Sequence, residues 1–62
     1  MNAREIKHVK KKLRQLKRDK RRALQRAATV LDLTGNTRLA DSIESLAQWN
    51  QILIEHYEGQ LP

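Results

Sequence analysis

The cationic side chains are the residues of this 62-residue sequence with the clearest potential for binding chemistry. Residues 1–31 hold 12 Lys and Arg against two acids, a balance of +10, and residues 32–62 hold one Arg against five acids, a balance of −4. The two balances add to the formal net charge of +6. Such an asymmetry between halves predicts an anionic partner, neutralisation of one half by the other, or both.

Most of these cations fall in one run whose periodicity is helical. Like charges four residues apart, such as Arg14 and Arg18, each cost a helix about 0.2–0.5 kcal/mol, so a helix selected for stability alone would contain more Glu. A linear cationic strip matches the phosphate array of a nucleic acid, and we therefore expect DNA or RNA backbone as a partner. The residues predicted to bind it are Lys7, Lys10, Lys11, Arg14, Lys17, Arg18, Arg21 and Arg22.

Two other interpretations of the cationic run stay open on the sequence. It is either a solvated face, partly neutralised by the acids of the second half, or a surface for a membrane or an acidic protein. The only aromatic residues, Trp49 and Tyr57, lie in the acidic half, so the run lacks the stacking platforms of single-strand binders. Gln15 and Gln25 are its only amide side chains, so recognition of the backbone is expected rather than reading of bases.

No group of residues has the spacing that catalysis, metal binding or cofactor binding requires. The sequence has no Cys, and His8 and His56 stand in no HxxH or HxxxH motif. It also lacks a Gly-rich phosphate loop and a nucleophile elbow. The carboxylates of Glu44, Glu55 and Glu58 are expected on helical turns facing water, not as a convergent pair. We therefore expect no enzyme activity, no catalytic residue, no metal and no cofactor.

The elements that position these side chains are predicted to be two helices. The only segment inside the sequence that favours a break between helices is 33–37, in which Gly35 can adopt the left-handed conformation that ends a helix. Asn36 or Thr37 can then cap the next helix. The sequence predicts helices over about 3–33 and 37–58, with a turn at 34–36, in one all-α domain of residues 1–62. A short turn makes the two helices antiparallel neighbours, which is a helical hairpin.

Apolar residues at alternating spacings of three and four predict the seam along which the helices meet. Lys20 and Asn50 interrupt the two halves of this seam, and each lies 15 residues from Gly35, so we expect them at about the same level. In the first helix the seam is Ile6, Val9, Leu13, Leu16, Lys20, Ala23, Ala27 and Val30. In the second it is Leu39, Ile43, Leu46, Asn50, Leu53 and Tyr57, widened by Ala40, Ala47 and Ile54.

A second apolar line, Trp49 and Ile52, lies partly outside that seam. One helix cannot cover both lines. In a chain this short, the free energy gained by burying apolar surface is about equal to the cost of the conformational entropy lost on folding. The sequence therefore predicts a homodimer that closes a four-helix bundle, because two-fold dimers are the commonest oligomers. Its predicted interface consists of Leu46, Trp49, Asn50, Ile52 and Leu53.

Taken together, these features predict a small non-enzymatic binding or adaptor protein that contacts nucleic-acid backbone through its basic first helix. The alternative is a protein–protein module that docks a different protein on the face of Trp49 and Ile52. The sequence contains no apolar run near 18 residues and no hydrophobic signal region at its start. We therefore expect a cytoplasmic protein.

Overall fold

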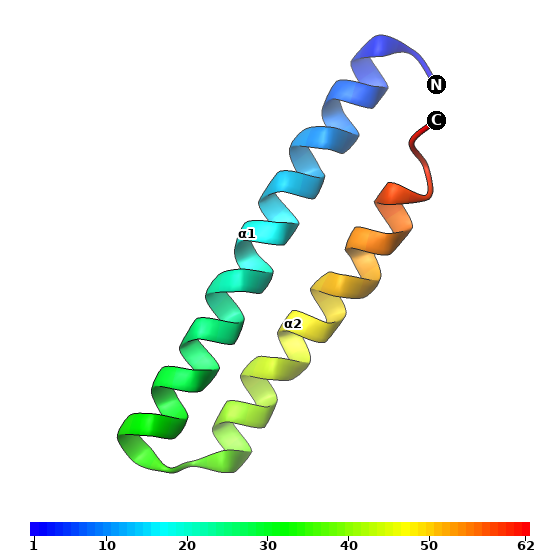
Figure 1. The fold of residues 1–62 in the computed structure, drawn as a ribbon. Helices are drawn as coiled ribbons and strands as arrows, with labels where there is room; N and C mark the ends of the chain where they lie inside the picture. The colour runs from blue at the N-terminus through cyan, green and yellow to red at the C-terminus, as the bar shows by residue number, and fades with distance from the viewer.

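Two antiparallel helices make up the fold, as the sequence predicts. The computed structural model describes all residues 1–62 and consists of α1 (Ala3–Thr34) and α2 (Thr37–Glu58), with no strand. Figure 1 shows the two helices side by side, with the N- and C-termini at the same end. Both helices begin and end within one residue of the predicted bounds. Neither helix contains a stretch long and apolar enough to cross a membrane.

Side-chain caps and one glycine set the helix ends. The Asn2 side chain accepts a hydrogen bond from the Glu5 backbone N–H over 2.9 Å at the start of α1. Gly35 ends α1 with a φ of 67°, and its N–H donates to the Leu31 carbonyl. Asn36 then caps α2 by accepting from the Leu39 N–H over 3.0 Å. Of the two residues predicted to cap α2, the structure uses Asn36, because a left-handed Gly35 turns the chain directly into it.

The core between the helices changes character along the hairpin. At the open end, four large residues form one buried cluster: Val9, Leu13, Leu16 and Ile54. Leu53, Tyr57 and Leu61 pack against this cluster, so the tail beyond α2 covers part of the first turns of α1. Towards the turn the buried residues are the alanines Ala27, Ala40 and Ala47. Small residues at these points allow the two backbones to approach closely.

The seam of α2 differs from the predicted one by a rotation of the helix. Ala40, Ala47 and Ile54, expected to widen the seam, are its buried centre, whereas Leu39 and Leu46 are 46% and 62% exposed. The predicted placement of these two leucines in the hairpin seam is therefore wrong. The physical reason is that α1 packs closest against the small side chains of Ala40 and Ala47, which leaves the bulkier leucines at the rim.

The single hairpin buries little. Seven of 62 residues are buried, and no large side chain is fully enclosed. Ile6, Lys20, Ala23 and Val30 of the predicted α1 seam are only half-buried. The stabilisation from burying a core of this size exceeds the cost of the conformational entropy lost on folding by only a small margin.

Candidate nucleic-acid interface

Five cations of α1 form one flank of the hairpin. They alternate spacings of three and four residues, which places their Cα atoms along the same side of the helix. The stripe spans 14 residues, or about 21 Å at 1.5 Å per residue, and no acidic residue interrupts it. We call it the cationic flank, and its members are Lys7, Lys10, Arg14, Lys17 and Arg21.

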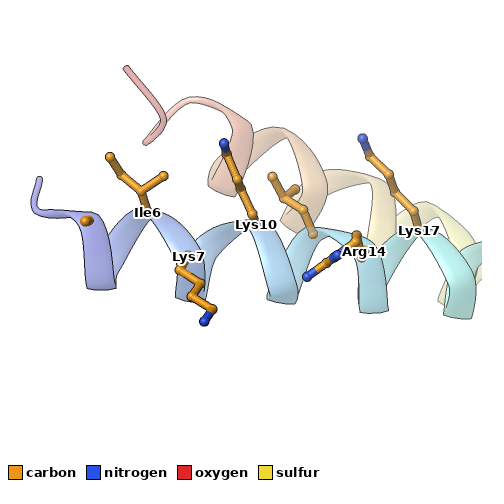
Figure 2. Close-up of a pocket in the computed structure, with 7 residues that line it drawn as sticks. Ile6, Lys7, Lys10, Arg14 and Lys17 are labelled. Carbon is orange, nitrogen blue, oxygen red and sulfur yellow. The ribbon is translucent and has the colours of Figure 1, made fainter.

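A shallow groove of about 650 Å³ follows the first part of this flank. Its cationic lining is Lys7, Lys10, Arg14 and Lys17, and apolar atoms come from Ala3, Ile6 and Leu13. Figure 2 shows Lys10 and Lys17 extending to the same side of α1, while Lys7 points the other way. A second groove continues along α1, where Lys17 and Arg21 lie opposite Gln51 and Glu58 of α2.

All eight predicted phosphate-binding residues are exposed, but they do not share one surface. Five of them constitute the cationic flank. Lys11 and Arg18 lie seven residues apart on the outer side of α1, next to the flank. Arg22 lies on the opposite edge of the hairpin, in a groove with Asp19 and Arg26. The sequence indicated exposure correctly, while the assignment of Arg22 to the other edge required the packing of α2.

The acids of α2 lie on the same side of the hairpin as the flank. Asp41, Glu44, Glu55 and Glu58 form a stripe with Gln48 and Gln51 at spacings of three and four. No hydrogen bond joins one of these carboxylates to a cation of α1, and the only side-chain hydrogen bond between the helices joins Lys20 to Gln51. The N–H donors of the flank are therefore available to an external anion, and a charged donor makes the stronger hydrogen bonds.

An exposed apolar strip runs along α2 on the other side. Its members are Leu39, Leu46, Trp49 and Ile52, of which Trp49 is 59% and Ile52 55% exposed. Of the predicted oligomer interface, Leu46, Trp49 and Ile52 lie in this strip, while Asn50 and Leu53 are half-buried beside it. Leu39 is the member that sequence reasoning missed. Its seven-residue spacing from Leu46 was the available signal.

The two histidines lie on different helices, His8 on α1 and His56 on α2 beside the apolar strip. His56 Nε2 is 3.1 Å from Gln60 Nε2, and its ring packs edge-on against Tyr57. No three His, Cys, Asp or Glu side chains are grouped so that they could hold a metal ion. Comparisons of the chain with protein-family models, curated proteins and solved structures find no match. Function is therefore inferred from the residues and geometry of the hairpin.

Proposed function

We propose that this protein is a non-enzymatic binding protein that contacts the phosphate backbone of nucleic acid through the cationic flank. The observation that carries the proposal is the flank itself: five exposed cations at alternating spacings of three and four along a single helix, with no acid among them and no hydrogen bond to α2. A row of cations of this kind neutralises phosphates and releases their counterions, which favours binding whatever the sequence of the nucleic acid.

The absence of stacking residues on α1 favours a double-stranded ligand. Single-strand binders place aromatic rings beside their cations, whereas Trp49 and Tyr57 both belong to α2. Trp49 also lies in the apolar strip, away from the flank. A duplex offers phosphates while keeping its bases stacked inside, so it needs no aromatic platform. Binding is accordingly expected to depend little on base sequence.

The test is the salt dependence of duplex binding. If about five phosphates are neutralised, the logarithm of affinity falls against the logarithm of salt concentration with a slope of about −4.5. Fluorescence anisotropy of labelled DNA and RNA duplexes at about 50 and 200 mM salt measures this slope. Changing Arg14, Arg18 and Arg21 to Glu is expected to abolish binding and preserve the fold, since all three are exposed. Folded wild-type protein that binds neither duplex at low salt would defeat the proposal.

We also propose that a second copy of the chain covers the apolar strip, which gives a homodimer of four helices. Three observations support this occupant. The hairpin core is thin, the strip exposes four large apolar side chains, and contact through α1 would oppose two helices of the same positive sign. Changing Trp49 and Ile52 to Ser is expected to weaken the dimer by about 2–4 kcal/mol, in the range of apolar truncations. Analytical ultracentrifugation at micromolar concentration measures the change.

A different protein docked on the strip is the alternative to self-association, and the exposure of Trp49 favours it equally. The two differ in the purified chain. Self-association predicts a dimer without any other protein present, whereas docking of a different partner predicts a folded monomer. A folded wild-type monomer at micromolar concentration would therefore replace the homodimer proposal by the docking alternative.

A further inference from the structure

The cationic flank and the apolar strip occupy opposite sides of the hairpin. Along one edge, Lys17 and Arg21 of the flank share a groove with Gln51 and Glu58. Along the other edge, Leu46 of the strip shares a groove with Arg22 and Arg26. We infer that the homodimer bridges two nucleic-acid duplexes, because pairing through the strips turns its two cationic flanks away from each other. This inference rests on the proposed function and on the proposed dimer.

Charge segregation identifies the strip as the surface that a second copy covers. The four acids of α2 all belong to the stripe on the side of the flank. Ser42, Ser45 and His56 are interspersed with the strip, while the charges that border it are Arg38, Glu55 one turn from Ile52, and the Asp19, Arg22 and Arg26 side chains in the groove with Leu46. Two copies joined at the strips leave these charges at the rim of the interface and place the cationic flanks of both α1 helices on the outside.

The thinness of the hairpin keeps the two flanks separate. Its Cα atoms extend 48 × 14 × 10 Å, so it is one helix thick. Two such layers, each helix about 10 Å across with side chains, separate the outer surfaces by on the order of 20 Å. A straight duplex that lies along one flank cannot reach the other, which faces in the opposite direction. The second flank therefore remains available for another duplex segment.

A two-duplex capture assay tests this inference. A biotinylated DNA duplex is immobilised, and retention of a fluorescent duplex is measured after adding the 62-residue protein at low salt. We expect retention at protein concentrations near that of the duplexes, and loss of retention at large excess, because each duplex is then saturated by its own dimers. Binding of a single duplex, followed by anisotropy in parallel, is expected to rise monotonically over the same range.

Matched variants connect bridging to the strip. Changing Leu46 and Trp49 to Ser is expected to lower retention at least tenfold while binding of a single duplex persists, since neither residue belongs to the flank. Both side chains are more than half exposed, so the hairpin core is retained. The control changes Leu31 and Leu33 to Ser: they are 45% and 80% exposed and lie on α1 outside the strip, and retention is expected to stay at the wild-type level.

The outcomes separate the inference from the proposals beneath it. No anisotropy change with either duplex overturns the nucleic-acid proposal itself. Binding of single duplexes without retention of the fluorescent duplex overturns bridging alone. Retention that survives in the Leu46→Ser/Trp49→Ser variant, or that persists at large protein excess, also overturns it, because bridging would then not depend on pairing of the strips.

Discussion

The Nζ of Lys20 donates a hydrogen bond to Oε1 of Gln51 over 2.7 Å, which joins the middle of α1 to the middle of α2. It is the only side-chain hydrogen bond between the two helices, and both residues are half-buried. Gln51 Nε2 in turn donates to Glu55 Oε1 over 3.2 Å. Lys20 interrupts an otherwise apolar seam, so this bond satisfies a charged group that burial would otherwise penalise.

Changing Gln51 to Leu is expected to destabilise the hairpin by about 1–2 kcal/mol, because it leaves the half-buried ammonium of Lys20 without its acceptor. The double variant Lys20→Leu/Gln51→Leu is expected to be at least as stable as wild type, since it replaces both polar partners by apolar side chains in the seam. Urea unfolding at fixed protein concentration measures both free energies. Equal stability of Gln51→Leu and wild type would show that the bond contributes nothing.

The two glycines are expected to respond to alanine with opposite signs. Gly35→Ala places a Cβ at a φ of 67° with no atom within 4 Å, so its cost of about 1–2 kcal/mol comes only from the left-handed backbone. Gly59 has a φ of −65° in the right-handed region, and an alanine there meets Glu55 and His56 carbonyls at ordinary contact distances. Gly59→Ala is therefore expected to stabilise by about 0.4–1 kcal/mol. Thermal unfolding compares the pair, and equal signs would contradict this account.

The helices and their turn could be predicted because their signals are local. Gly35 and Asn36 act within a few residues of themselves, and neither helix contains an interior Gly or Pro. The rotation of α2 could not be predicted in the same way. Two heptad patterns share Ile43, Asn50 and Tyr57, and they differ in whether three leucines or their neighbours Ala40, Ala47 and Ile54 face α1. The larger apolar side chains of the leucines led to the prediction that they face α1, whereas close approach of the two backbones favours the alanines at these positions.

The same rotation explains what the sequence could and could not indicate about the site. Exposure of the cations follows from their types and positions on α1 alone. Their division between the two edges of the hairpin depends on the position of α2, which is set by contacts between residues far apart in the sequence. Lys20 illustrates the difference, because the sequence placed Asn50 at its level and the structure gives it Gln51 as its acceptor. One residue of helix rotation decides which amide reaches the ammonium.

Asn50 is expected to contribute to the specificity of the dimer. Its side chain is half-buried beside the apolar strip, and it makes no side-chain hydrogen bond within the chain. Asn50→Leu is expected to raise the melting temperature and to broaden the distribution of oligomers, as removal of a polar seam residue does in coiled coils. Thermal unfolding and analytical ultracentrifugation measure the two effects. A variant that loses stability and keeps one oligomeric state would give Asn50 a different role.

Neutralising the cationic flank is expected to change the salt dependence of duplex binding by a defined amount. In the variant Arg14→Gln/Lys17→Gln/Arg21→Gln, two of the five flank cations remain, so the slope should fall from about −4.5 to about −1.8. The matched control carries Lys12→Gln/Arg22→Gln/Arg26→Gln, outside the flank, and lowers the net charge by the same three units. Its slope should stay near −4.5, because none of its altered residues contacts the duplex. Glutamine is a good helix former, and all six positions are exposed, so circular dichroism should report unchanged helix content in both variants. Equal slopes in the two variants would mean that the duplex responds to net charge alone, and the flank would then lose its status as the binding site.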